Sequence, residues 1–289
     1  MREEFDHIVI GGGASGCVAA ARLVTDGGRR VLLLEAGHSH HHPLLDMPPG
    51  IFKLINGSKY MTYHHTVPQQ HLNGRVHDIP QGNVLGGGTS VNAQVYMRGR
   101  PSDYDEWDQL LRGSNDGAAW DWATVLQHFR RIEGNNRLSN DFHGNDGPLL
   151  VSDPGHVDDV SRWFVQSVQL KGEPFTNDFN GVTQRGVGFY QFMNRKGKRS
   201  SAAYAYVEPL KDDPRLTVRL RAAVQLINIE NGRAVSVTYR DAAGAEHTAH
   251  SSGDIVLSSG ALVTPKLLML SGIGPAEQLD SHGIRTLVD

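Results

Sequence analysis

Apolar runs and one helix-type segment alternate along the first 35 residues of the chain. Residues 6–10 form a short apolar run, residues 17–24 are rich in helix formers, and residues 31–34 are continuously apolar. Gly27 and Gly28 are suited to ending the helix. A run without polar alternation is typical of a strand buried on both faces of a parallel sheet. The pattern therefore predicts a strand–helix–strand unit of about 30 residues.

Three later segments have the pattern of helices. In residues 121–132, apolar side chains recur at three- and four-residue spacing, which predicts a helix with one apolar face. Residues 103–111 and 157–170 are also predicted to be helical. The tryptophans fall on or beside these segments and are expected in the core: Trp107, Trp120, Trp122 and Trp163.

From residue 215 the pattern changes to short alternating runs separated by turn residues such as Asn231-Gly232. This predicts an antiparallel meander, with strands at 216–220, 224–229, 235–239 and 247–250. Residues 254–260 are then predicted to be a buried strand that runs into a tight turn. Residues 284–289 have the composition of a strand that is cut short, so we expect an incomplete chain; a terminal edge strand is the alternative.

Composition narrows the class of protein. The 289 residues suffice for one large domain or two smaller ones, and 39% hydrophobic with 20% charged residues indicates a folded chain. A net charge of −3 disfavours a nucleic-acid partner. The single cysteine, Cys17, excludes an internal disulfide framework and a cysteine-based zinc site. No apolar run is long enough to span a membrane and no signal peptide is recognisable, so a cytoplasmic location is expected.

The first candidate site is the glycine motif Gly11-x-Gly13-x-x-Gly16, which lies between the first strand and the helix. In a dinucleotide-binding loop the first glycine permits a tight turn, the second leaves space for the pyrophosphate, and the third lets helix and strand pack closely. Glu35 follows Gly16 by 19 residues, at the end of the next strand, where its carboxylate can accept hydrogen bonds from a ribose. That carboxylate disfavours NADP, but the motif does not separate NAD from FAD. A glycine-rich turn without a ligand is the alternative.

Two further glycine-rich strings carry a resemblance to a known family. They are residues 82–99 (GNVLGGGTSVNAQVYMRG), which are expected to lead into a helix, and residues 260–274 (GALVTPKLLMLSGIG). Together with the first loop they resemble the glucose–methanol–choline (GMC) flavin oxidoreductases, with choline dehydrogenases, aryl-alcohol oxidases and hydroxymethylfurfural oxidases as the most similar members. Further matches extend the resemblance over nearly the whole chain, at residues 68–75, 103–107, 143–148 and 199–206.

The resemblance implies a cofactor and a set of contacts. Covalent-flavin members of the family carry a histidine where this chain has Val91, so FAD is expected to be held noncovalently. The cofactor-binding residues implied by the loop and the resemblance are Gly11, Gly13, Ala14, Ser15, Gly16, Glu35, Ala36, Val84, Gly87, Gly88, Asn92, Ala93, Gln94, Val95 and Val224. Among these, Val224 matches the family residue whose backbone meets the adenine; an ordinary strand valine is the alternative.

The resemblance also implies a fold and an activity. The expected fold class is α/β: a Rossmann-like FAD-binding domain with a parallel central sheet and an antiparallel meander, plus part of a substrate-binding cap. Residues 1–155 and 211–289 are expected to form the FAD-binding domain, and residues 156–210 the piece of the cap. The expected activity is oxidation of a primary alcohol to an aldehyde by hydride transfer to flavin N5. A noncatalytic flavin-binding subunit and a cyanohydrin lyase are the alternatives.

No catalytic or metal-binding residue is assigned in this chain. The family's catalytic histidine and its His or Asn neighbour lie C-terminal of the second signature, so we expect the base outside this segment, with a complementary polypeptide as a possible partner. The cluster His38, His40, His41 and His42 is capable of binding a metal, but a solvated loop is favoured because no acidic pair lies nearby. Structural packing is favoured for Cys17. Substrate contact is a minor alternative for the extended-segment histidines His64, His65, His71 and His77.

Overall fold

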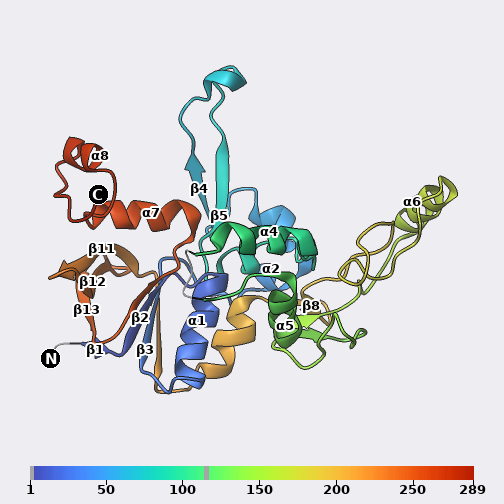
Figure 1. Cartoon of the computed structure of the whole chain (residues 1–289), viewed down its shortest axis with the longest axis horizontal. Coiled ribbons are helices and arrows are strands. Elements are labelled where there is room, and N and C mark those ends of the chain that lie inside the picture. The colour runs from blue at the N-terminus through green and yellow to red at the C-terminus, as the bar shows by residue number, and fades with distance from the viewer. Residues whose placement is uncertain (1–2, 114–116) are drawn as a thin grey trace. The chain divides into compact units, whose positions relative to one another are not determined.

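The computed structural model describes residues 3–113 and 117–289, and it consists of two compact units (Figure 1). The first unit runs to Asn92 and resumes from Ser201 to Asp289; the second is Ala93–Ser200. The functional domains expected from the sequence, with a cap piece at 156–210, stay a prediction.

A parallel sheet forms the centre of the first unit. Its strand order is β10-β3-β2-β14, and each neighbouring pair is parallel. Every residue of β3 is buried, as its continuously apolar sequence predicts. The strands are β2 (His7–Ile10), β3 (Val31–Glu35), β10 (Leu216–Leu220) and β14 (Ile255–Leu257).

Helix α1 (Ala14–Thr25) covers one face of this sheet, beside the short π-helix η4 (Ala203–Val207), as Figure 1 shows. Val9 and Leu33 point to this side, where small α1 side chains such as Ala20 allow close packing. This arrangement confirms the strand–helix–strand unit predicted from residues 6–34. Burial of aliphatic side chains on both faces of β3 stabilises the unit by roughly 1.5–3 kcal/mol per side chain.

A second, largely antiparallel sheet packs on the other face. Ile8, Leu32 and Leu34 share a core with Val237 and Tyr239 of this sheet. Its order is β1-β13-β12-β11, in which only β1 pairs in parallel. The elements of this layer are β1 (Glu4–Phe5), β11 (Ala223–Glu230), β12 (Arg233–Arg240), β13 (Glu246–Ser251) and α7 (Gly260–Leu270). The predicted α/β class, with a parallel sheet and additional antiparallel strands, is confirmed.

One strand was placed wrongly by the sequence pattern. Residues 216–220 were expected in the meander, but β10 pairs in parallel with β3, from Leu216 beside Val31 to Leu220 beside Glu35. Arg221 then adopts a left-handed conformation, with φ of 53°, and separates β10 from β11. Alternating apolar residues describe a strand but not its partner, which here comes from the far end of the sequence.

Shorter elements complete the first unit. A β-hairpin of β4 and β5 extends from it (Figure 1). These elements are α2 (Pro43–Asp46), η1 (Pro48–Gly50), α3 (Ile51–Leu54), β4 (Met61–His65), η2 (Gln70–Leu72), β5 (Asp78–Gly82), η3 (Gly87–Ser90), η5 (Glu208–Leu210) and α8 (Ala276–Ser281). The string at residues 82–99 contains the single turn η3 and, as expected, leads into a helix, which begins at Pro101. One expectation fails here. Residues 284–289 form no strand, only an isolated bridge from Val288 to Ile273.

The second unit contains the three predicted helices, and its ribbon is labelled in Figure 1. Its elements are α4 (Pro101–Leu111), α5 (Trp122–Ile132), β6 (Glu133–Asn135), β7 (Leu149–Val151), α6 (Asp159–Leu170), β8 (Asn194–Arg195) and β9 (Lys198–Arg199). The expected core position is wrong for Trp107, Trp120 and Trp163, which are exposed. Trp122 is half-buried and stacks on Tyr104. Helical spacing identified these helices but did not show which faces the unit covers.

A buried network of charges lies inside the second unit. Glu133 is fully buried and accepts a hydrogen bond of 2.6 Å from Arg98, while its other oxygen lies 2.8 Å from Nδ1 of His143. Nε2 of His143 lies 3.1 Å from Asp178. Burial opposes the charged form of His143, but its hydrogen bonds to Asp178 and Glu133 outweigh that effect and raise its pKa. Because each buried charge has a partner, the network is compatible with a stable interior.

Within the described residues, no helix has the length and apolar character needed to cross a membrane.

Candidate cofactor site

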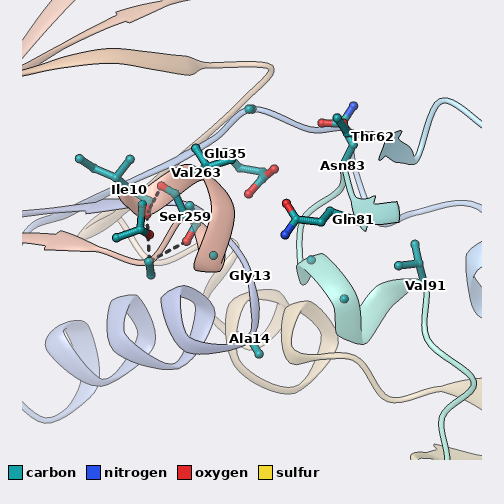
Figure 2. Close-up of a pocket in the computed structure, with 18 of the residues that line it drawn as sticks. Ile10, Gly13, Ala14, Glu35, Thr62, Gln81, Asn83, Val91, Ser259 and Val263 are labelled. Atoms are coloured by element: carbon teal, nitrogen blue, oxygen red, sulfur yellow. Dashed lines mark hydrogen bonds between the residues drawn. The ribbon is translucent and has the colours of Figure 1, made fainter. Parts of the chain in front are cut away.

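The first unit contains a cavity of about 930 Å³. It opens where β2, β3 and β14 end, so it lies at the carboxyl edge of the parallel sheet, the usual place for a ligand in such sheets. The loop after β2, the start of α7, the base of the β4–β5 hairpin and η3 form its walls. Figure 2 shows Gly13, Glu35, Gln81 and Ser259 around this space.

Two glycines of the first loop are required by the packing of the protein itself. Gly11 has a φ of 95°, and a Cβ atom there would lie 2.6 Å from the carbonyl oxygen of Ser258. A Cβ atom on Gly16 would lie 1.9 Å from the carbonyl oxygen of Gly11. Both positions therefore exclude any side chain, in agreement with the predicted tight turn and close helix–strand packing.

At Gly13 and Gly88, by contrast, packing within the protein does not exclude a side chain. Both line the cavity. A Cβ atom on Gly13 would meet its nearest neighbour, the carbonyl oxygen of Ser258, only at 4.0 Å, and one on Gly88 would meet nothing within 4 Å. The space that these two missing side chains leave belongs to the cavity, as a closely approaching ligand requires.

The amino end of α1 faces the same space. Gly13 is its N-cap residue and provides no side-chain acceptor for the first-turn N–H groups. Ala14 and Ser15 are exposed and line the cavity. Unsatisfied N–H groups and the helix dipole favour an anionic group at this end.

Glu35 ends β3 and is held firmly by backbone donors. Its Oε2 accepts the N–H of Gly12 and its Oε1 accepts the N–H of Gly37, each at 2.7 Å. The residue is only 8% exposed. Burial raises the pKa of Glu35 above its ordinary value, while the N–H groups of Gly37 and Gly12 oppose that rise. In Figure 2 the carboxylate faces the amide of Gln81 across the cavity.

Several polar residues that line the cavity were not predicted from the sequence. Gln81 and Asn83 come from the segment entering the second glycine string, and Ser259 comes from the turn after β14. Nε2 of His64 lies 3.1 Å from Oε1 of Gln81, which orients that amide. The turn at residues 258–260 was visible in the sequence, but only the fold brings it against the first glycine loop.

Most of the predicted cofactor residues come together around this cavity, and their role as cofactor contacts stays a prediction. Gly16 and Val84 do not line it, although both are buried in the same unit. Ala93, Gln94 and Val95 belong to the second unit, where Gln94 is buried and accepts a hydrogen bond from Asn194. Those that line the cavity are Gly11, Gly13, Ala14, Ser15, Glu35, Ala36, Gly87, Gly88, Asn92 and Val224.

Cys17 lies behind the loop rather than in the cavity. Its Sγ donates to the carbonyl oxygen of Gly12 at 3.2 Å, and burial raises its pKa to about 12. A thiol with that pKa stays protonated at neutral pH. These observations agree with the structural role favoured from the sequence.

Comparisons with known proteins identify the family of this chain. The profile of the family described as GMC oxidoreductase matches residues 5–284. "Alcohol dehydrogenase [acceptor]" of Pseudomonas putida is 41% identical over 287 residues, 99% of this chain and 51% of that protein. "Choline dehydrogenase, mitochondrial" of Mus musculus is 38% identical over 96% of this chain and 47% of that protein.

A solved structure is also similar to this chain. The crystal structure of pyridoxine 4-oxidase from Mesorbium loti superposes with a TM-score of 0.89 at 32% identity, covering 98% of this chain and 55% of that one. The chain spans about half the length of the curated relatives it matches. A dinucleotide-type loop, a cavity at the carboxyl edge of a parallel sheet and a profile match over almost all of its residues show that the chain belongs to the GMC oxidoreductase family.

Proposed function

We propose that this chain binds FAD noncovalently in the cavity of its first unit and contributes it to the oxidation of a primary alcohol to an aldehyde. The observation that carries the proposal concerns two glycines, Gly13 and Gly88. Both line the cavity, and the space left by their missing side chains is not filled by other protein atoms, so it is open to a ligand. Membership of the GMC family makes FAD the dinucleotide of choice over NAD. Val91 in place of a histidine supports noncovalent attachment.

The residues of the cavity fit the parts of this cofactor. The amino end of α1, with Gly13 as N-cap, would hold the pyrophosphate through backbone N–H groups. Glu35 would accept the ribose hydroxyls, and Val224 would lie at the adenine. Gly87 and Gly88 would give the isoalloxazine ring a surface without side chains. When bound, FAD supplies the hydride acceptor for the reaction.

Glu35 is able to accept hydrogen bonds from the protein backbone and from the ribose at the same time. An ionised carboxylate has about four lone-pair positions. Two are used by the N–H groups of Gly12 and Gly37, which fix the orientation of the group. The remaining positions are available to a diol, so the site is formed before the ligand arrives.

We expect Glu35→Ala to weaken FAD binding by roughly 1–3 kcal/mol, because charge-assisted hydrogen bonds are lost. Glu35→Gln should cost less, since its amide oxygen still accepts. The measurement is FAD titration at limiting cofactor, with unfolding followed in parallel because the alanine variant also leaves two N–H donors without partners. Equal FAD retention by wild type and Glu35→Ala would refute the ribose role.

The substrate class rests on the relatives. The two curated relatives compared above are named for acting on alcohols and choline, which supports a small alcohol as the substrate of this chain. The catalytic base is expected outside this segment, and a complementary C-terminal polypeptide is the partner that would supply it. The cytoplasmic location likewise stays a prediction from the sequence.

Anaerobic mixing of FAD-loaded 1–289 with a panel of alcohols, choline and benzyl alcohol included, tests the proposal. Loading itself should be saturable, and heat should release a fluorescent flavin. We expect no saturable bleaching by the chain alone, because loss of a general base typically costs about 10²–10⁴ in rate. Bleaching should appear when a relative's C-terminal portion is supplied. A colourless protein that does not bind FAD would overturn the cofactor assignment, and saturable bleaching by the chain alone would place the base within it.

A further inference from the structure

Three potential metal ligands converge in the first unit, away from the cofactor cavity. His40 and His41 lie in the segment that follows β3, and Glu208 is the first residue of η5. One ligand atom from each lies within 4.8 Å of the others. None of the three lines the cavity. The histidines were recognisable in the sequence but the carboxylate was not, because Glu208 lies 167 positions after His41 (208 − 41).

The distances fit a tetrahedral metal ion. Oε2 of Glu208 lies 3.1 Å from Nε2 of His41 and 3.4 Å from Nε2 of His40. Bonds of 2.0–2.1 Å to a tetrahedral zinc ion place neighbouring ligand atoms about 3.3 Å apart. Both distances to Glu208 therefore match a tetrahedral zinc site, and the ligand atoms of the two histidines lie within 4.8 Å of each other.

The burial of His40 is a separate argument for a metal site. The residue is 4% exposed, and neither of its ring nitrogens makes a hydrogen bond within the described structure. A buried polar atom without a hydrogen bond costs about 1–3 kcal/mol. Nε2 of His40 has only the 3.4 Å contact with Oε2 of Glu208, and Nδ1 has no hydrogen bond in the described structure. Its ring is fixed between His41, with ring centroids 4.0 Å apart, and Tyr204, 4.5 Å away. The expected solvated loop is thus wrong for His40.

The surroundings favour a cation. Nε2 of both imidazole rings faces Oε2 of Glu208, so the two nitrogens and the carboxylate oxygen point into the same space. Asp46 adds negative charge nearby and accepts a hydrogen bond from Tyr204 at 2.7 Å. Lys211 lies 3.4 Å from Oε1 of Glu208 and leaves Oε2 to the histidines.

We propose that His40, His41 and Glu208 bind one divalent transition-metal ion, with zinc as the best fit and water at the fourth position. Two imidazole nitrogens disfavour calcium and magnesium, which prefer oxygen ligands. The bound ion would tie the segment after β3 to η5 and would give Nε2 of His40 a metal bond in place of its 3.4 Å contact with Glu208.

The test is a Zn²⁺ titration of the full chain, after treatment with EDTA, in competition with a chromophoric chelator. We expect one ion per chain, and at least tenfold weaker binding in Glu208→Gln and in His41→Gln. His41 is exposed, so its substitution should leave the fold intact. His65→Gln is the matched control, because it removes another histidine beside a carboxylate, with Nδ1 2.6 Å from Asp78, on an exposed hairpin.

The control should bind zinc like the wild type. Zinc should also raise the unfolding temperature of the wild type and of His65→Gln, but not that of Glu208→Gln. Equal zinc affinity in all four proteins would assign the binding to exposed histidines and overturn the proposal. Failure of the wild type to compete with the chelator for zinc would overturn it equally. Neither readout depends on FAD or on an alcohol, so the result is independent of the proposed function.

Discussion

Gly13→Val should abolish useful FAD binding while leaving the protein folded. The new side chain would enter the cavity at the amino end of α1, where the pyrophosphate is proposed to lie. We expect affinity to fall by about a hundredfold or more, equivalent to ~2.7 kcal/mol. Flavin fluorescence titration measures this loss directly.

The structure gives the reason to expect a native fold in this variant. Gly13 has φ of −74° and ψ of −165°, an extended conformation that valine adopts readily. Its Cβ atom would lie 4.0 Å from the nearest protein atom. The free energy of unfolding of the variant should therefore differ from that of the wild type by no more than about 1 kcal/mol, the usual size of an N-cap effect.

Two companion variants make this result specific. Gly155→Val is the matched control, because a Cβ atom there meets nothing within 4 Å and the residue is exposed outside the cavity. It should bind FAD like the wild type. Gly16→Val should instead disturb folding, since its Cβ atom would overlap the carbonyl oxygen of Gly11. Wild-type FAD affinity in a folded Gly13→Val protein would contradict the proposed position of the pyrophosphate.

The second large effect concerns the stability of the second unit. Glu133→Ala should lower its free energy of unfolding by about 3–5 kcal/mol, because it leaves the buried guanidinium of Arg98 without its carboxylate. The same change removes an acceptor from His143 and from Asn135. Urea unfolding followed by tryptophan fluorescence measures this loss, since all four tryptophans of the chain lie in this unit.

An exposed ion pair of the same unit is the control for this experiment. Glu173 lies 3.3 Å from Arg185, and both side chains are largely accessible. Glu173→Ala should cost less than about 1 kcal/mol, as exposed pairs usually do. The stability loss of Glu133→Gln should be intermediate between those of Glu133→Ala and Glu173→Ala, because glutamine keeps the side-chain volume and one acceptor oxygen. Similar stability losses in Glu133→Ala and Glu173→Ala would show that the buried network contributes little.

Local sequence was sufficient to predict the secondary structure where one short segment contains a whole structural unit. The first 35 residues include both strands, the helix between them and the glycines that the loop needs, so β2, α1 and β3 were predicted close to their observed limits. Helix α5 was predicted for the same reason, because its apolar spacing is internal to the element. Partner choice was not readable in this way. The alternating run of β10 is compatible with either sheet, and its pairing with β3 depends on residues about 185 positions away, as the register from Val31 to Leu216 shows (216 − 31).

By itself the sequence determined the family, the α/β class and the loop at which a dinucleotide is proposed to bind, because these depend on glycines and apolar runs at fixed short spacing. Only the tertiary structure decided which polar groups meet. It placed Gln81 opposite Glu35 and put Glu208 beside His40. It also buried His143 between Glu133 and Asp178. Such contacts join side chains from distant segments, and their energies arise from burial and distance, which a linear pattern does not contain.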